Sequence, residues 1–309
     1  MRQSIVAGFL IVAGISTLSA RTPGQQPEGY PAVGAPAIVT LISAGAAPRS
    51  ALRYTVSAGD KQHMDMTMNM SMSMDMGGMS MPAMTLPDMK MGADLVVTDV
   101  SPAGDLTFTI AYTGVTVGAG ADPAIAAQLQ TMSDNIKSFK GSATLNNRGV
   151  TRTANFDLGK MADSQVGQMM KSMSDQLKNM STPLPEEEVG VGARWESRQA
   201  LDANGMKMFQ KTQFELVAFD GKTATLKTKI EQTAPPQAIS NPAMPPDADV
   251  QLQQMTSAGS GTMTLRLNGL VPTSDISVES TVVMQVALGG NTQQMGITTS
   301  LKTTVAPGK

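Results

Sequence analysis

Methionine alternates with polar residues in one run of the chain, and its thioether sulfur is capable of specific chemistry. Seven methionines occupy every second position from Met64 to Met76, and 12 of the 26 methionines fall within residues 64–91. Because side chains of a strand alternate between faces, an extended run places all seven thioethers on one face and the polar groups on the other. Thioether sulfur ligates soft cations such as Cu(I) and Ag(I), and it also forms an adaptable apolar surface.

A second group of methionines follows the run. Gly77-Gly78 and the prolines between positions 82 and 87 interrupt the strand, after which Met89 and Met91 resume the apolar pattern. This order predicts the second arm of a hairpin, with its methionines across from the first group. The candidate ligand-binding residues are therefore Met64, Met66, Met68, Met70, Met72, Met74, Met76, Met89 and Met91.

Three interpretations of this segment remain open. The first is an apolar contact surface for a hydrophobic ligand or an envelope protein, because unbranched thioethers repack around varied partners. The second is a Cu(I) or Ag(I) site, for which the metal ligands would be drawn from His63, Met64, Met66, Met68, Met70, Met89 and Met91. His63 has the opposite parity from the methionines, so an unbroken strand would direct it away from them. The third is core packing in a structural envelope protein that binds no small ligand.

Enzymatic chemistry finds little support in the composition. The chain has no cysteine and one histidine, which leaves few candidates for a nucleophile and base pair. It also lacks a zinc-protease helix, a phosphate loop and a Gly-x-Ser-x-Gly elbow. The net charge of −2 and the aromatic content of 4% do not suit nucleic-acid binding, which needs a basic surface and stacking rings. We therefore expect a protein that is not an enzyme and has no nucleic-acid partner.

The N-terminus predicts export. Arg2 precedes an apolar stretch from Ile5 to Ile15, and a small-residue segment ends at Ala20, as in a secretory signal peptide of residues 1–20. Residues 21–37 are rich in Pro, Gly, Gln and Ala and are expected to form a flexible leader. No later stretch approaches the roughly 20 apolar residues of a membrane-spanning helix. The expected location is periplasmic or extracellular.

The remaining pattern predicts a mainly β (α+β) protein built of antiparallel sheets in two related halves, residues 38–182 and 183–309. Alternating apolar residues predict strands at 39–42 and 52–56, and hairpins at 95–112, 214–230 and 276–305. Apolar residues at helical spacing predict two amphipathic helices, at about 123–139 and 164–180, packed on sheet faces. Gly259-Ser-Gly261 is interpreted as the start of a strand, by analogy with Gly141.

Several framework segments resemble an uncharacterised family of exported bacterial proteins of about this length. They are Val39-Thr-Leu-Ile42, Gly45, Pro48-Arg49, Leu52-Arg53-Tyr54, Gly59-Asp60-Lys61, Leu184-Pro-Glu-Glu187, Val191-Gly-Ala-Arg-Trp195 and Asn241-Pro-Ala-Met244. These are turn and packing residues, and the family has no assigned activity. The resemblance therefore implies export and a shared β-rich fold, and it transfers no catalytic residue.

Overall fold

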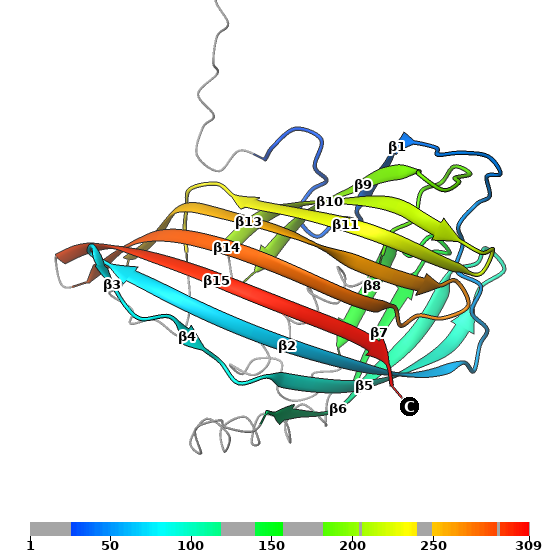
Figure 1. Cartoon of the computed structure of the whole chain (residues 1–309), viewed down its shortest axis with the longest axis horizontal. Coiled ribbons are helices and arrows are strands. Elements are labelled where there is room, and N and C mark those ends of the chain that lie inside the picture. The colour runs from blue at the N-terminus through cyan, green and yellow to red at the C-terminus, as the bar shows by residue number, and fades with distance from the viewer. Residues whose placement is uncertain are drawn as a thin grey trace, which may run out of the picture.

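The described part of the chain forms one antiparallel sheet (Figure 1). The computed structural model describes residues 26–118, 140–156, 182–203, 206–239, 249–288 and 291–308, which contain 15 strands. The strands are β1 (Ile38–Ser43), β2 (Lys61–Met76), β3 (Met79–Ser80), β4 (Met84–Thr85), β5 (Met89–Val100), β6 (Leu106–Val117), β7 (Lys140–Leu145), β8 (Thr151–Phe156), β9 (Arg194–Ala203), β10 (Met206–Phe219), β11 (Thr223–Ala234), β12 (Gln237–Ala238), β13 (Asp249–Arg266), β14 (Thr273–Leu288) and β15 (Asn291–Pro307). Their main order is β1-β9-β10-β11-β13-β14-β15-β2-β5-β6-β7-β8, while β3 and β4 pair with β2, and β12 pairs with β13.

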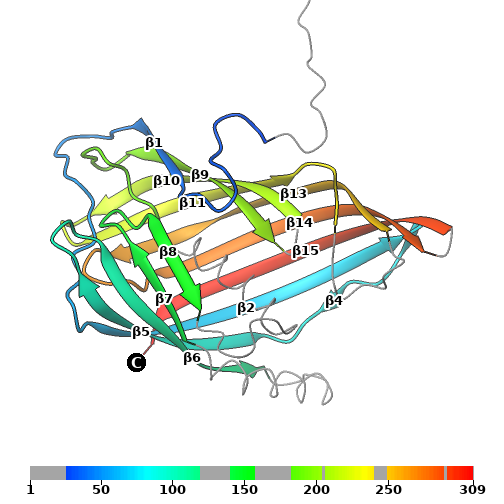
Figure 2. The same cartoon turned by 180° about the vertical axis from the view of Figure 1, so that it is seen from behind.

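The sheet curls on itself at one end of the molecule, as Figures 1 and 2 show from opposite sides. One buried cluster there joins Val97 of β5 and Leu106 of β6 to Trp195 of β9 and Leu226 of β11, although these strand pairs are far apart in the sheet order. We call this the closed end. At the other end, β2, β13, β14 and β15 extend beyond the shorter strands. We call that the open end.

Two glycines let β13 and β14 approach closely. A Cβ atom on Gly259 would lie 2.7 Å from the carbonyl oxygen of Ser277, and one on Gly261 would overlap the carbonyl oxygen of Asp275. Glycine inside a strand commonly marks a bend or a close backbone approach. The interpretation of Gly259 as a strand start is wrong, because it lies well inside β13.

Trp195 is the centre of the closed end. Its side chain is fully buried, stacks on Phe214 with 5.5 Å between ring centroids, and donates from Nε1 to the carbonyl oxygen of Pro183 at 3.0 Å. The apolar residues Leu52, Tyr54 and Val56 are buried beside it.

Residues 52–56 follow the predicted alternation but do not form a strand. The amide of Tyr54 donates to the carbonyl of Asn147 at 2.8 Å, and the amide of Thr55 donates to that of Leu267 at 2.6 Å. The segment therefore lies between two turns of the sheet and bonds to them instead of to a strand. The predicted strand is wrong, because alternating apolar residues indicate which side chains are buried but not which backbone they pair with.

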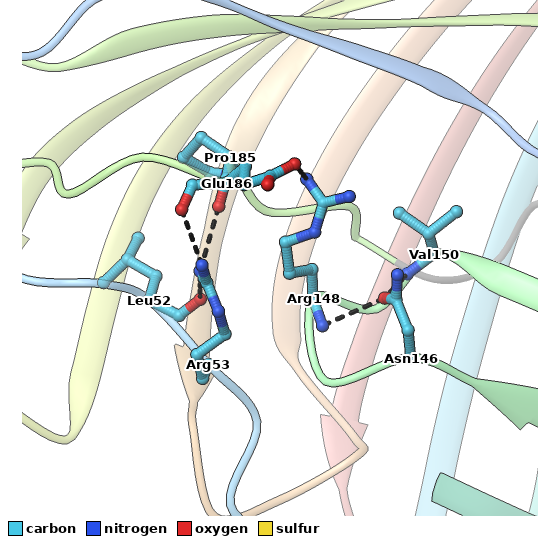
Figure 3. Close-up of polar contacts among 7 residues, drawn as sticks. All are labelled: Leu52, Arg53, Asn146, Arg148, Val150, Pro185 and Glu186. Atoms are coloured by element: carbon cyan, nitrogen blue, oxygen red, sulfur yellow. Dashed lines mark hydrogen bonds and ion pairs between the residues drawn. The ribbon is translucent and has the colours of Figure 1, made fainter. Parts of the chain in front are cut away.

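A guanidinium group ties the closed end together (Figure 3). Arg53 donates from Nη1 to the carbonyl oxygens of Leu52 at 2.7 Å and Pro185 at 3.0 Å, and from Nη2 to that of Glu186 at 2.6 Å. Arg148 lies beside it, with Nη1 3.6 Å from Oε2 of Glu186. Burial and the charge of Arg148 lower the pKa of Arg53. We call this set of contacts the arginine clasp.

The N-terminal part of the described chain lies against the sheet. The ring of Tyr30 meets that of Phe209 edge-on at 5.3 Å between centroids, the guanidinium of Arg198 lies over Tyr30 at 5.7 Å, and the amide of Gly34 donates to the carbonyl of Ala200. These contacts place part of the expected leader, from residue 26 on, beside β9 and β10.

The expected α+β fold class is wrong, because the described residues contain strands and no helix. The two predicted helices, 123–139 and 164–180, lie outside the described residues. The strands also form one continuous sheet instead of separate sheets in two halves, since β15 pairs with β2 and joins the C-terminal strands to the N-terminal ones. Sequence patterns show local hairpins well, but they carry no signal for a pairing between residues 61–76 and 291–307.

The local hairpins are confirmed. β5 pairs with β6, β10 pairs with β11, and β14 pairs with β15, each antiparallel to its sequence neighbour. The strand at 39–42 corresponds to β1. The antiparallel character of the sheet was therefore readable from the sequence.

Candidate functional site

The seven alternating methionines lie on one face of β2, which we call the methionine face. The two ends of this face differ in burial. Met64 is 3% exposed, the methionines from Met66 to Met74 are half-buried, and Met76 is 39% exposed. The thioethers therefore form neither a sealed core nor a fully exposed row.

The neighbouring strands continue this face with apolar residues. On the β5 side, Met66 lies opposite Met91, and Met68 lies opposite Met89. On the β15 side, Met70, Met74 and Met76 lie opposite Leu301, Ile297 and Met295, respectively. The structure thus brings Met89 and Met91 beside the strand that carries the other seven predicted site residues.

An apolar cavity of about 220 Å³ opens on the methionine face near the closed end. Met64 and Met66 of β2 line it together with Phe108 and Ile110 of β6 and Met263 of β13. These residues come from strands on both sides of the curl, so the closure of the sheet creates the cavity. Apolar cavities of about 150 Å³ in other proteins stay dry and hold benzene, so this one has room for a small apolar group.

Few polar groups reach this cavity. Thr182 lines it and donates from Oγ1 to the sulfur of Met263 at 3.0 Å, while Ser274 and Thr303 supply further hydroxyl groups. Tyr54 also lines it, and burial raises the pKa of its phenol well above the ordinary value, so Tyr54 remains neutral. The lining carries no ionisable acid or base that is charged at neutral pH, which suits an apolar occupant.

The structure does not bring His63 together with the methionines. His63 lies on the opposite face of β2, where Nδ1 contacts Oδ1 of Asp94 at 2.5 Å and Nε2 lies 3.5 Å from Oδ1 of Asp65. The hydrogen bond with Asp94 raises the pKa of His63. A metal site that combines His63 with Met64, Met66, Met68, Met70, Met89 and Met91 would therefore need ligands from both faces of the strand.

A larger hollow, of about 750 Å³, lies beside His63. It is lined by Lys61, Asp94, Arg266, Asn268 and their neighbours, and no methionine touches it. Its polar, charged lining does not resemble a binding site for an apolar ligand. Within the described ranges, no three His, Asp or Glu side chains are grouped so as to hold a metal ion.

Sequence reasoning missed most of the cavity wall. The alternation of β6 marks Phe108 and Ile110 as buried, and Met263 is half-buried on β13, but nothing in the sequence shows that the three surround one cavity with Met64. It also left out Met79, Met81 and Met84, which are 75%, 49% and 50% exposed. The sequence alone does not show that these three methionines are exposed.

No helix in the part of the chain that the structure describes is long and apolar enough to cross a membrane. Residues 131–269 match the model of a family of unknown function (DUF6263), in agreement with the expected resemblance to an uncharacterised family. The matched part includes three of the framework segments, Leu184-Pro-Glu-Glu187, Val191-Gly-Ala-Arg-Trp195 and Asn241-Pro-Ala-Met244. A search of curated proteins found no match.

Proposed function

We propose that this protein is an exported, non-enzymatic binding protein whose cavity and methionine face take up a hydrophobic ligand. The cavity carries this proposal, because it is apolar, is lined by Met64 and Met66, and lies where the curled sheet closes. The proposal of export rests on the signal-like residues 1–20.

The gradient of burial supports an elongated ligand. At about 220 Å³ the cavity is smaller than the roughly 300 to 1,000 Å³ of sites that enclose a whole drug-sized molecule. It therefore fits one end of a longer apolar molecule. The half-buried thioethers from Met66 to Met74 continue from the cavity and supply the surface for the remainder. Methionine suits such a surface, since its flexible side chain adapts to different partners.

Two neighbouring threonines of β15 provide a matched test. Thr303 lines the cavity and lies opposite Ile276 and Met68, whereas Thr304 lies opposite Asp275 and Thr67 on the other face. We expect Thr303→Phe to fill the cavity and weaken binding of the apolar dye N-phenyl-1-naphthylamine at least tenfold, about 1.4 kcal/mol. Thr304→Phe should bind the dye within about twofold of the unaltered protein.

The measurement is a fluorescence titration of protein produced from the full chain in a bacterial host. Mass spectrometry of the same preparation would check the proposed export, because cleavage after Ala20 leaves a chain that begins at Arg21. Circular dichroism and the emission of Trp195 report whether each variant keeps its fold. Equal dye binding by folded Thr303→Phe and Thr304→Phe would show that the cavity is not the binding site.

A further inference from the structure

Three methionines lie in a line across neighbouring strands at the open end. Met295 of β15 lies opposite Met76 of β2, and Met76 lies opposite Met79 of β3. Directly opposed residues of antiparallel strands share a face, with Cβ atoms about 4.5 to 5.5 Å apart. Three thioethers on flexible side chains therefore start close enough to converge on one point.

The turn between β2 and β3 holds two of these methionines opposite each other. Gly77 and Gly78 have φ values of 59° and 86°, the left-handed conformation that both central residues of a type I′ hairpin turn require. Asp75 fixes this turn, since its Oδ1 accepts from the amide of Gly78 at 3.2 Å and its Oδ2 accepts from the hydroxyl of Ser80 at 2.9 Å. The position of Met79 beside Met76 is therefore set by the backbone before any ligand binds.

The exposed large apolar residues of this segment are all methionine. Among the described large apolar residues that are exposed, the four between positions 76 and 84 are Met76, Met79, Met81 and Met84. A surface for apolar contact can use methionine for its flexibility, but it does not need methionine alone, because Leu, Ile and Phe also serve there. A surface that uses only methionine points to sulfur chemistry, and thioethers are the soft ligands that a chain without cysteine retains.

We propose that Met76, Met79 and Met295 bind one Cu(I) or Ag(I) ion at the open end of the sheet. The site is separate from the cavity and does not involve His63, which distinguishes it from the metal site expected from the sequence. Met284 of β14, directly opposite Met295, is placed to support it as a further thioether. Binding forms only metal–sulfur bonds, with the ion supplied already in its monovalent state.

Neutral thioethers give this site a distinctive pH dependence. Histidine and cysteine ligands bind metals less well in acid, because protons compete for the same atoms. Methionine sulfur does not take up a proton in this range, so affinity at the proposed site should change less than about threefold between pH 5.5 and 8. A loss of tenfold or more toward pH 5.5 would assign the ion to His63, the one histidine of the chain, and would overturn the proposal.

The decisive experiment is anaerobic titration with Cu(I) against a colorimetric Cu(I) chelator, repeated with Ag(I) by calorimetry. The site variant is Met76→Leu/Met79→Leu/Met295→Leu, and the matched control is Met66→Leu/Met68→Leu/Met91→Leu on the same face near the cavity. Leucine preserves volume and apolar character, so both variants should fold. We expect about one ion per protein chain, at least tenfold weaker binding in the site variant, and unchanged binding in the control.

Two further outcomes, both from this titration, would overturn the proposal. One is an unaltered protein that fails to compete with the chelator, and the other is a site variant that binds as tightly as the control. Met79→Leu alone gives a check that folding cannot confound, because Met79 is 75% exposed, and we expect it to weaken binding severalfold. Met76, Met79 and Met295 do not line the cavity and lie beyond the thioethers from Met66 to Met74 that we propose hold the apolar ligand, and leucine stays apolar. The site variant should therefore keep its dye binding, so that the two proposals are tested separately.

Discussion

Adjacent residues of β2 have opposite surroundings, because their side chains point to opposite faces of the sheet. Met64 is buried in an apolar cluster, while His63 lies among the carboxylates of Asp65 and Asp94 with its side chain 30% exposed. The imidazole is therefore placed for proton binding, and the thioethers are placed for apolar or soft-metal contacts.

The single histidine gives a direct test of this arrangement. We expect the pKa of His63 to lie above its ordinary value of 6.5, because the carboxylate of Asp94 accepts a hydrogen bond from the imidazolium. A raised pKa means that the pair stabilises the fold fully below pH 6.5 and that this contribution is lost as the pH rises through the folded-state pKa. An NMR titration of the His63 ring protons measures the value without ambiguity of assignment.

Asp94→Asn is the corresponding control. The substitution removes the charge and keeps a side chain of similar size, so the pKa of His63 should move back toward 6.5. An unchanged titration in this variant would contradict the assigned role of Asp94.

For single residues, the sequence predicted the face of the strand to which each side chain points, but it did not predict how deeply each side chain is buried. The two-residue period predicted that Met64 to Met76 share one face and that His63 points away from it, and both are seen. The fall in burial from Met64 to Met76 was not predictable. It depends on how the curl of the sheet brings Phe108 and Ile110, two strands away on β6, and Met263, three strands away on β13, around Met64.

At the scale of elements, the glycines of β13 should control how closely β14 can approach. Gly261→Ala would place a methyl group against the carbonyl oxygen of Asp275, and neither strand can move without breaking ladder hydrogen bonds. We expect a loss of about 1 to 3 kcal/mol in the free energy of unfolding, the usual cost of overpacking. Urea denaturation followed by circular dichroism measures it.

Gly296→Ala is the matched control within the same sheet. A Cβ on Gly296 of β15 would meet only the Cβ of Asp75, at 3.7 Å, which is an ordinary contact. Its free energy of unfolding should change by less than about 0.5 kcal/mol. Equal effects at Gly261 and Gly296 would show that close approach to β14 is not what selects glycine in β13.

Strand prediction succeeded where the partner is the next segment in the chain. β5–β6, β10–β11 and β14–β15 are such neighbours, and turn residues mark each of them. It failed at residues 52–56, whose amides bond to turns near Asn147 and Leu267. Those partners are distant in sequence, and apolar alternation contains no information about them.

At the scale of the whole molecule, the two ends of the sheet differ in what holds them. The closed end is joined by the buried cluster around Trp195 and by the arginine clasp, whereas Met76 and Met79 at the open end are exposed. The proposed apolar site lies near the closed end and the proposed metal site lies at the open end. A rigid closed end would keep the cavity formed while the open end remains accessible.

In the arginine clasp, the hydrogen bonds of Arg53 should stabilise the fold more than the ion pair of Arg148 does. Arg53 donates to three carbonyl oxygens, and hydrogen bonds from a charged donor contribute about 1.5 to 3 kcal/mol each when buried. The ion pair of Arg148 with Glu186 is 3.6 Å long and has a carboxylate that is 80% exposed, so it should contribute little. We therefore expect Arg53→Ala to lower the free energy of unfolding by about 2 kcal/mol, since Arg53 is only half-buried and water can replace part of its bonding.

Glu186→Ala separates the two contributions, because it removes the carboxylate and keeps the main-chain carbonyl that Arg53 binds. It should cost less than about 0.5 kcal/mol. Urea denaturation followed by the emission of Trp195 reports directly on the closed end, where this residue is fully buried. If Glu186→Ala proved as destabilising as Arg53→Ala, the surface ion pair and not the carbonyl bonding would close this end of the sheet. In that case, the free energy of unfolding would also fall with added salt, because salt screens an exposed ion pair. The hydrogen bonds from Arg53 to carbonyl groups should depend much less on salt.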